Sequence, residues 1–355
     1  MVASGRAIAQ LVQESSGHGC GSYARRPLVR HPLTMHPFTY HQAESTADAV
    51  RALASPVAAP LGGGTDLLVL MKEDLVRPAT LVDLRRIPGA RDIALHDDGS
   101  ARIGCVVRLE ELASHAGIAE RYAALAQAAA AVGTPQLRTM GTMGGNLAQR
   151  PRCWYFRGGL PCFKNGATDC LAETGETHYH ALFTNGTCHA VHPSDPLVAL
   201  TALEATVEVT GAGGVRTLTL AALFEGSARR AEGETTLAAG EFISAVLLPP
   251  SAAGGVQFYE KLMQRGAWDF ATVSLAAHRG ADGTVRMALG GVLLGPCRVN
   301  PSVEEDVTTG GLDDDSIDAL AERAMHDAKP LEHNGYKVWQ AQALLRRAMR
   351  RLDPP

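Results

Sequence analysis

The sequence predicts an α+β protein of two or three domains, and three observations carry this prediction. The chain has 355 residues, which is long enough for more than one packed core. Short apolar or β-branched runs typical of strands are interspersed with Ala- and Leu-rich stretches typical of helices, without internal repeats. Two glycine-rich turns, at residues 62–64 and 141–145, separate apolar segments in the first half of the chain.

Composition argues against nucleic acid or a membrane as a partner. The formal net charge is −4 and the pI is near 6.4, so the chain lacks the basic field that nucleic-acid binding requires. One dense basic run, Arg346, Arg347, Arg350 and Arg351, has helical spacing and is typical of a solvated helix face. No apolar run approaches the ~20 residues that a membrane-spanning helix needs.

Residues 1–34 are expected to form a flexible N-terminal extension. They are rich in Gly, Ser, Arg and His and contain no hydrophobic core of a signal peptide. A strand is predicted from Met35 to Tyr40, so Met35 is expected to be the natural start of the protein. Cys20, within the extension, is expected to have no role.

The elements of the first half follow from periodicity and from turn residues. A short amphipathic helix is predicted over residues 47–54, with Thr46 as its N-cap. Strands are predicted over residues 80–84 and 101–107. The remaining helices of this half are predicted over residues 109–116 and 122–131.

The second half reads as a hairpin followed by a second domain. A helix over residues 196–203 precedes the hairpin, whose strands at 206–210 and 216–220 meet across glycine-rich text. A further strand is predicted at 242–248, ended by Pro249 and Pro250. From about residue 257 we expect strands over 258–263, 272–278 and 284–294, then helices over 315–328 and 336–352.

The two glycine turns have the composition of an anion-binding site. Gly62, Gly63 and Gly64 lack a Cβ, so their backbone N–H groups can converge on an anion. The second turn adds the hydroxyl of Thr142 and the amide of Asn146 as donors. Neither the dinucleotide fingerprint nor the P-loop spacing is present. Taken alone, the first turn is equally compatible with an ordinary tight turn.

Four of the seven cysteines fall within 36 residues. Cys153, Cys162, Cys170 and Cys188 are separated by eight, seven and seventeen residues. Structural zinc sites usually pair cysteines more closely, and disulfides suit small secreted domains, so a [4Fe–4S] cluster is favoured. Zinc and unligated thiols remain alternatives, and one of the nearby histidines could replace a thiolate: His178, His180, His189 and His192.

Positive charge and aromatic residues surround this cysteine group. Arg150, Arg152, Arg157 and Lys164 would offset the charge of a thiolate-bound cluster, and Trp154, Tyr155 and Phe156 would keep water off its sulfurs. Cys105 lies in an apolar strand and Cys297 at a strand end, so neither is expected to ligate metal.

Several segments of the chain resemble those of a known family. Segments 62–67 and 142–147 are similar to the two flavin loops of the FAD-binding medium subunit in the molybdenum hydroxylase (xanthine dehydrogenase) family. Segment 192–200 and Lys261, with Arg265, Asp269 and Ala271, match further flavin contacts of that family. Segments 152–156 and 161–162 resemble its cluster-bearing branch, as in bacterial periplasmic aldehyde oxidoreductase and 4-hydroxybenzoyl-CoA reductase. The resemblance extends from about Met35 to Leu352.

The resemblance implies a domain plan. An FAD-binding domain of two subdomains, of the vanillyl-alcohol-oxidase/MurB-like (PCMH) type, would occupy residues 35–225, with the iron–sulfur loop at 150–190. Residues 226–256 would connect it to a C-terminal α+β domain, 257–355, built from a three-stranded sheet and helices.

The resemblance also implies roles for individual residues. Lys261 would be the catalytic residue, stabilising the reduced flavin at its N1/C2 carbonyl edge, and Asp195 would bind a ribityl or ribose hydroxyl. The four cysteines of segment 153–188 would ligate the [4Fe–4S] cluster. The implied cofactor-binding residues are Leu61, Gly62, Gly63, Gly64, Thr65, Asp66, Leu67, Thr142, Gly144, Gly145, Asn146, Asp195 and Lys261.

The implied function is electron transfer within a larger complex. A [2Fe–2S] subunit and a large molybdopterin-binding subunit would be the partners, and FAD would pass electrons between the [2Fe–2S] centres and an external acceptor. An aldehyde or an aromatic compound is the implied substrate. A self-sufficient FAD oxidase and a scaffold subunit with a degenerate flavin site are the alternatives. The compartment would be cytoplasmic, or periplasmic if a partner carries a twin-arginine signal.

Overall fold

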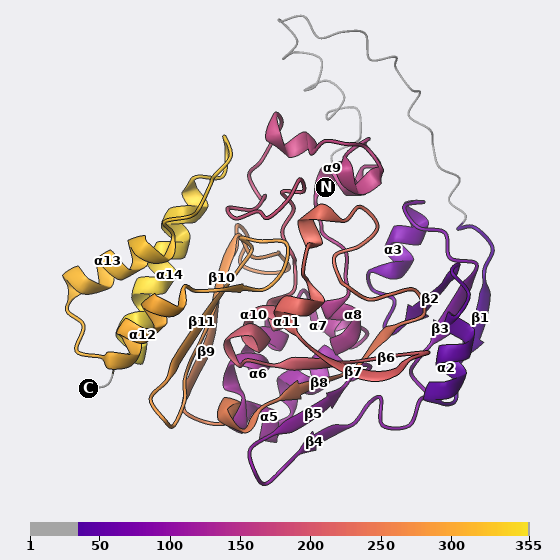
Figure 1. The fold of residues 1–355 in the computed structure, drawn as a ribbon, viewed down its shortest axis with the longest axis horizontal. Coiled ribbons are helices and arrows are strands. Elements are labelled where there is room, and N and C mark those ends of the chain that lie inside the picture. The colour runs from indigo at the N-terminus through magenta and orange to yellow at the C-terminus, as the bar shows by residue number, and fades with distance from the viewer. Residues whose placement is uncertain (1–34, 354–355) are drawn as a thin grey trace, which may run out of the picture. The chain divides into compact units, whose positions relative to one another are not determined.

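Three sheets organise residues 35–353, the part of the chain that the computed structural model describes (Figure 1). The expectations for residues 1–34, including the role of Cys20, lie outside these described residues. The mixed α+β class is confirmed. Among the helices from residue 35 to residue 353, none is both long enough and apolar enough to cross a bilayer.

The first sheet is parallel and carries the first glycine turn. Its strands are β1 (Thr39–Gln42), β3 (Thr80–Asp83) and β2 (Ala58–Leu61), in that spatial order. Helix α2 (Thr46–Leu53) is capped by Ser45, whose hydroxyl accepts from the Asp48 N–H at 3.1 Å, one residue before the predicted cap. The turn at 62–64 leads directly from β2 into helix α3 (Leu67–Lys72).

The second sheet has five antiparallel strands, and a late strand lies at its centre. The order is β4 (Ile93–Leu95), β5 (Ala101–Gly104), β8 (Phe242–Leu248), β6 (Thr206–Gly211) and β7 (Gly214–Thr219). The segment 226–256, expected to be a connection, thus supplies β8 between β5 and β6. The helices associated with this region are α4 (Leu109–Ser114), α5 (Ala116–Arg121), α6 (Ala123–Ala130), α10 (Asp195–Ala202) and α11 (Leu220–Leu223).

The third sheet is buried on both faces. Its strands are β9 (Val256–Leu262), β10 (Val273–Arg279), β11 (Val285–Gly290) and the two-residue β12 (Cys297–Arg298), which adds a fourth strand to the three expected. Along β10, Ala276 packs into the core that contains α10, whereas its neighbours Leu275 and Ala277 pack into the core that contains α14. The helices after this sheet are α12 (Pro301–Thr309), α13 (Asp314–Ala324) and α14 (Tyr336–Leu352).

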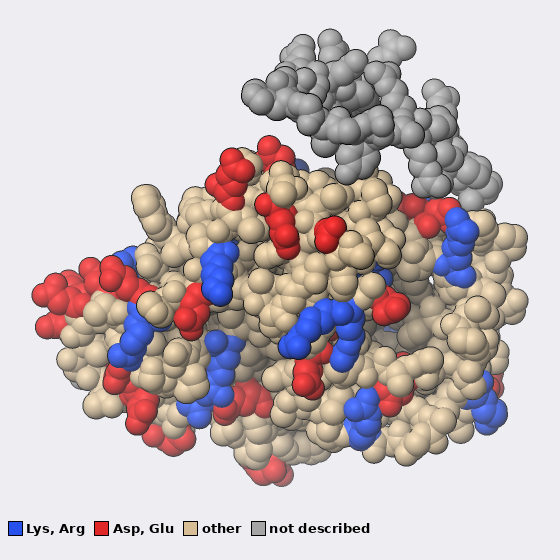
Figure 2. All heavy atoms as spheres, turned by 45° about the horizontal axis from the view of Figure 1, so that its top comes forward, with Lys and Arg blue, Asp and Glu red and all other residues tan. Residues whose placement is uncertain are grey.

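The basic run near the C-terminus lies on α14, as predicted, and is largely ion-paired. Arg350 binds Asp314 at 2.8 Å and Arg346 binds Asp318, both on α13. Arg347 binds Glu260 at 3.0 Å. Acidic side chains gather at the end of the molecule that α12 and α13 form (Figure 2), so α14 neutralises part of that charge.

Residues 150–190, here called the cysteine loop, contain only short helical turns. These are α9 (Trp154–Arg157), η1 (Phe163–Asn165) and η2 (Leu171–Glu173). The fully buried Lys337 of α14 donates from Nζ to the carbonyl oxygens of His180 at 2.7 Å and Gly291 at 2.5 Å, which ties the loop to the third sheet. The other short elements are α7 (Pro135–Arg138), α8 (Met143–Leu147), η3 (Ser227–Arg229) and η4 (Pro250–Ala252).

Candidate functional site

The two glycine turns pack directly against each other. A Cβ at Gly63 would lie 1.7 Å from the carbonyl oxygen of Met140, and one at Gly62 would lie 2.5 Å from Thr142 Oγ1. Gly64 has φ of +73°, a left-handed conformation that favours glycine. The glycines of the first turn are therefore required by the contact between the turns and by backbone conformation, in addition to any ligand.

The second turn opens helix α8 and is held by its own side chains. Thr142 is the N-cap of α8, and its Oγ1 accepts from the Gly145 N–H at 3.3 Å. The Gly144 N–H donates to the Cys105 carbonyl at 2.8 Å, and a Cβ at Gly144 would meet the Cys105 Cβ at 2.9 Å. Cys105 is thus a buried packing residue, as predicted, and it supports the turn.

Three adjoining cavities connect the turns to the third sheet. The first, of about 600 Å³, is lined by the turn residues Gly62–Leu67 with Thr142 and Gly145. The second, of about 320 Å³, shares Thr65 and Gly145 with the first and extends to Lys261. The third, of about 290 Å³, shares Arg152, Asp195 and Phe270 with the second and extends to Cys153. An elongated ligand can therefore lie from the turns to the third sheet.

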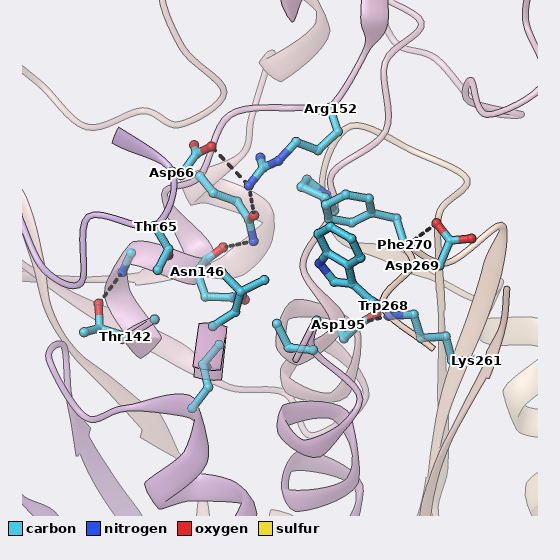
Figure 3. Close-up of a pocket in the computed structure, with 18 of the residues that line it drawn as sticks. Thr65, Asp66, Thr142, Asn146, Arg152, Asp195, Lys261, Trp268, Asp269 and Phe270 are labelled. Atoms are coloured by element: carbon cyan, nitrogen blue, oxygen red, sulfur yellow. Dashed lines mark hydrogen bonds and ion pairs between the residues drawn. The ribbon is translucent and has the colours of Figure 1, made fainter. Parts of the chain in front are cut away.

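The second cavity has a polar side and an aromatic side. Figure 3 shows Thr65, Asp66 and Asn146 on one side, facing Trp268 and Phe270 on the other. Leu61, Gly63, Gly64 and Leu67 line the first cavity alone, whereas Gly144 is buried against Cys105 and lines none of the three cavities. Most of the predicted cofactor-binding residues are thus brought to one elongated space.

A buried triad stands at the far end of the second cavity. Lys261 Nζ binds Asp195 Oδ2 at 2.8 Å, and the Tyr259 hydroxyl donates to Asp195 Oδ1 at 2.5 Å. Burial raises the pKa of the Asp195 carboxyl, while the Lys261 ammonium and the Tyr259 hydroxyl counter that rise by stabilising its charged form. Burial and the neighbouring Asp195 also raise the pKa of Tyr259, so its hydroxyl stays a donor. Asp195 and Lys261, assigned separate flavin contacts from the sequence, bind each other here.

Asp66 joins the first glycine turn to the cysteine loop. Its carboxylate accepts from the Arg150 backbone N–H at 2.9 Å and from the Arg157 guanidinium at 2.7 Å, and it lies 3.0 Å from Arg152. Burial lowers the pKa of Arg152 to about 10. The carboxylate predicted to contact the cofactor is therefore engaged by the loop that carries the cysteines.

Several cavity residues were missed by sequence reasoning. Trp268 and Phe270 come from the turn between β9 and β10, and Trp268 adopts φ of +53°, an uncommon conformation for a bulky side chain. Arg265 donates to the Trp268 carbonyl at 2.9 Å and its guanidinium lies over the indole ring. The sequence did offer a signal for these two cavity residues, because a turn between strands is usually hydrophilic and this one contains two aromatic side chains.

The four cysteines of the cysteine loop lie close together. Cys153 packs against two small apolar clusters, one of which contains Cys162 and the other Cys188. The pKa of Cys153 is raised to about 11, mainly by burial and to a smaller extent by the charges of Cys162 and Cys170. A hydrogen bond with Cys188 lowers the pKa of Cys170 to about 6 and raises that of Cys188. Within residues 35–353, no three of these sulfurs converge tightly enough to hold a single metal ion.

Other side chains around the cysteines differ in part from expectation. Cys153 Sγ lies 3.3 Å from His180 Nε2, whereas His192 is buried on the Leu147 carbonyl and Phe224. Of the four cations expected to offset a cluster, Arg152 and Arg157 bind Asp66, and Arg150 and Lys164 bind the buried Glu234 at 2.8 and 3.1 Å. Each of the four cations is thus already paired with a carboxylate of the chain.

Comparisons with known proteins agree with this geometry. Residues 36–251 match the family described as the FAD binding domain in molybdopterin dehydrogenase. The chain is 37% identical over 301 residues to the aldehyde oxidoreductase FAD-binding subunit PaoB of Escherichia coli (strain K12), covering 84% of this chain and 92% of that one. It is 27% identical over 297 residues to the putative xanthine dehydrogenase FAD-binding subunit XdhB of the same organism, covering 81% and 85%.

A solved structure has the same fold. A chain of the carbon monoxide dehydrogenase from Hydrogenophaga pseudoflava superposes with a TM-score of 0.69 at 26% identity. The superposition covers 90% of this chain and 98% of that chain. The arrangement of sheets around the cavities is therefore shared along nearly the whole of both chains.

Proposed function

The chain belongs to the family of FAD-binding domains of molybdopterin dehydrogenases, and from this membership we propose that it is the FAD- and [4Fe–4S]-containing electron-transfer subunit of a heteromeric molybdenum hydroxylase acting on an aldehyde or an aromatic substrate. The observation that carries the proposal is the continuous run of cavities from the two glycine turns to the Lys261 triad, with the cysteine loop against its side. An elongated dinucleotide fits a space of this form.

FAD, when bound, supplies reversible two-electron redox chemistry. The turn residues would hold its polar backbone, with Thr65 and Asn146 as side-chain donors into the cavity. Trp268 and Phe270 would cover its ring system and exclude water. Each of these residues already lines the space, so binding requires little rearrangement of the turns.

Lys261 places a positive charge at the end of the second cavity, and its surroundings fix that charge in position. Nζ is held by Asp195 at 2.8 Å and by the Ala131 carbonyl at 3.1 Å, and Tyr259 orients Asp195 from behind. A preorganised charge stabilises negative charge that develops on a bound group without reorganising at the moment of reaction. Lys261 is therefore proposed as the residue that favours the reduced cofactor.

The cysteine loop fits a [4Fe–4S] cluster by its donor set. Cys153, Cys162, Cys170 and Cys188 supply four free thiols from one loop, and a cluster of this kind takes four thiolates. Cysteine sulfur is the soft ligand that iron–sulfur clusters require. A bound cluster would supply one-electron transfer.

The proposed partners are a [2Fe–2S] subunit and a molybdopterin-binding large subunit, with an external electron acceptor at the flavin. The sequence contains no plant-type cysteine run for a [2Fe–2S] centre. Oxidation of the organic substrate would accordingly take place in the large subunit, and this chain would pass electrons onward.

An anaerobic reduction experiment tests the electron-transfer role. The isolated chain, loaded with FAD, is mixed with an aldehyde, a purine or an aromatic acyl thioester while flavin absorbance is followed. We expect no bleaching until the partner subunits are added, because the molybdenum centre is proposed to lie in the large subunit. Rapid bleaching of the isolated chain by any of these compounds would instead indicate a self-sufficient oxidase.

Iron analysis tests the cluster. Each of the six described cysteines and Cys20 is changed singly to Ser, which is a poor soft ligand for iron. Cys105→Ser, Cys297→Ser and Cys20→Ser should retain about four irons and matching sulfide per chain. The four variants at 153, 162, 170 and 188 should lose them. Full iron in Cys188→Ser would remove that residue from the ligand set and make His189, near Glu173, the next candidate.

A further inference from the structure

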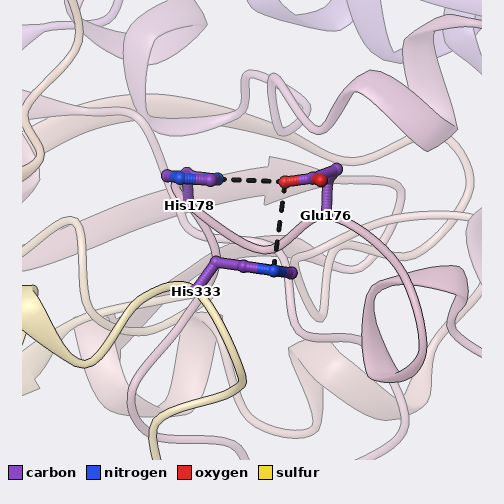
Figure 4. Close-up of side chains that lie close together, drawn as sticks. All are labelled: Glu176, His178 and His333. Atoms are coloured by element: carbon purple, nitrogen blue, oxygen red, sulfur yellow. Dashed lines mark hydrogen bonds and ion pairs between the residues drawn. The ribbon is translucent and has the colours of Figure 1, made fainter. Parts of the chain in front are cut away.

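A second group of side chains of metal-ligating type lies at the surface and does not line the three cavities. Glu176 and His178 follow η2 in the cysteine loop, and His333 precedes α14, 155 residues further along the chain. One ligand atom of each lies within 4.8 Å of the other two, and within residues 35–353 no other three His, Cys, Asp or Glu residues meet this condition. Figure 4 shows the two imidazoles side by side, with the carboxylate beside both.

The backbone beneath these side chains is already fixed. The His333 N–H donates to the hydroxyl of the buried Thr177 at 2.9 Å, and the Tyr336 hydroxyl donates to the His178 carbonyl at 2.9 Å. The buried Asn334 amide donates to the carbonyls of His180 and Ala181 at 3.1 Å each. The two segments are therefore held together without a metal, and a ligand that joins them has little backbone entropy to overcome.

Two imidazoles and one carboxylate form a donor set that suits Zn²⁺. Glu176 Oε2 lies 3.1 Å from His178 Nδ1 and 3.9 Å from His333 Nδ1, so both Nδ1 atoms face the same carboxylate oxygen. The side chains are 64%, 48% and 32% exposed, which leaves room for water to complete the coordination. The rings are parallel, with centroids 5.3 Å apart, so one ring must tilt, and the half-exposed His178 is free to do so.

We propose that Glu176, His178 and His333 bind a divalent transition-metal ion of the zinc type, which fastens the cysteine loop to the start of α14. Binding to the folded chain alone stabilises it by mass action, because the two segments separate on unfolding. The site is distinct from the four cysteines, since none of its three ligands is a cysteine and His333 lies in the turn before α14, outside the cysteine loop.

Calorimetric titration with Zn²⁺ tests the site on the full chain after treatment with a chelator. Wild type and the control His326→Ala, which removes an exposed histidine outside the group, should bind one more zinc than His333→Ala or Glu176→Gln. Any zinc taken up by free thiols would appear equally in all four proteins. The difference between them therefore reports this site whether or not the cysteines carry a cluster.

A thermal measurement separates loss of the ligand from loss of the fold. Without metal, His333→Ala should unfold at the same temperature as His326→Ala, whereas added Zn²⁺ should raise the midpoint of the control and of wild type only. Equal zinc stoichiometry in wild type and His333→Ala would overturn the proposal. So would a dissociation constant weaker than about 1 mM for the additional ion in wild type.

Discussion

Among single residues, Tyr259 controls the charge pair at the end of the second cavity. Its hydroxyl is the second donor to the buried Asp195, so Tyr259→Phe leaves one carboxylate oxygen without a hydrogen bond. We expect a loss of about 1 to 3 kcal/mol in the free energy of unfolding, as for other buried groups left unpaired. Denaturant unfolding of the FAD-loaded protein measures this loss.

The flavin reduction potential gives a second readout, because Lys261 is held through Asp195. A more negative potential in Tyr259→Phe would follow if the ammonium becomes less well positioned. Tyr155→Phe is the matched control, since its hydroxyl donates to an exposed backbone carbonyl, that of Glu176, at 3.2 Å. Identical stability and potential in the two variants would contradict the positioning role.

His192 makes the region before α10 sensitive to acid. Its Nε2 donates to the Leu147 carbonyl at 3.2 Å and its Nδ1 accepts from the Ser194 N–H at 3.4 Å, so the buried ring is neutral. Burial lowers its pKa to about 3, whereas an unfolded histidine titrates near 6.5. Between these two pKa values the unfolded chain binds more protons than the folded chain. The free energy of unfolding therefore falls as the pH drops from about 6.5 toward 3.

Comparing variants measures how steeply the free energy of unfolding depends on pH. His192 should contribute a loss of about 2 kcal/mol between pH 7 and pH 5. The glutamine of His192→Gln cannot titrate. Between pH 7 and pH 5 the free energy of unfolding of this variant should therefore fall by less than that of wild type, and the difference should equal this loss. His326→Gln, at an exposed position, should keep the wild-type slope. Parallel curves for wild type and His192→Gln would rule out the assignment.

The sequence predicted Lys261 and Asp195 as site residues but not their contact. The two lie 66 residues apart in the chain, and no local pattern pairs them. Tyr259 was predictable in principle, because it precedes Lys261 by two residues in β9 and therefore points to the same face of the sheet. The arginine contacts of Asp66 carried no such signal, because Asp66 and Arg150 lie 84 positions apart and no local pattern relates them.

At the scale of elements, the contact between the glycine turns should tolerate no side chain at Gly63. The Cβ of Gly63→Ala would overlap the Met140 carbonyl oxygen, a backbone atom that cannot rotate away. We expect a loss of about 1 to 3 kcal/mol in stability and release of FAD, because the turns must separate. Flavin retained after gel filtration and the unfolding midpoint both report this change.

Gly213→Ala provides the comparison for that substitution. Gly213 lies in the turn between β6 and β7, and an added Cβ would meet no atom within 4 Å. Its stability should stay within about 0.5 kcal/mol of wild type, with full FAD content. If Gly63→Ala behaved in the same way, the two turns would not depend on close contact.

The elements predicted best are those whose apolar residues recur at a clear spacing along the sequence. The hairpin of β6 and β7 lies where the alternation of apolar and polar residues and the intervening glycines predicted it. Strand β8 has the predicted bounds. The apolar run that forms α3 carries no period, so its state could not be read from the sequence. Helix α12 was missed although Asn300 followed by Pro301 is a helix-start signal, because few apolar residues follow at helical spacing.

At the scale of the whole molecule, the position of the cysteine loop depends on contacts that only the fold creates. Lys337 and Asn334 hold its far end, and Asp66 holds its beginning against the first glycine turn. Each contact joins residues more than 80 positions apart, so periodicity and turn chemistry could not predict them. The sequence predicted candidate residues for both sites, but only the structure shows that the first glycine turn and the cysteine loop are in contact.

This contact predicts that the flavin site and the cysteine loop are coupled. Asp66→Asn removes the negative charge that faces the Arg152 and Arg157 guanidinium groups and the Arg150 backbone N–H. The two guanidinium groups then repel each other, and the start of the loop loosens. We expect FAD content and iron content to fall together in this variant. Faster proteolytic cleavage between residues 150 and 160 should accompany the loss.

Thr65→Ala distinguishes coupling from simple loss of flavin. Thr65 lines the first two cavities and is next to Asp66 in the chain, but no cysteine-loop residue binds its side chain. Its removal should lower FAD content and leave iron and proteolysis unchanged. Glu73→Gln, at 3.9 Å from Arg157 and 40% exposed, should change neither cofactor, because an exposed ion pair at that distance contributes little. Unchanged iron in Asp66→Asn would mean that the loop keeps its shape without the carboxylate, and the coupling would be refuted.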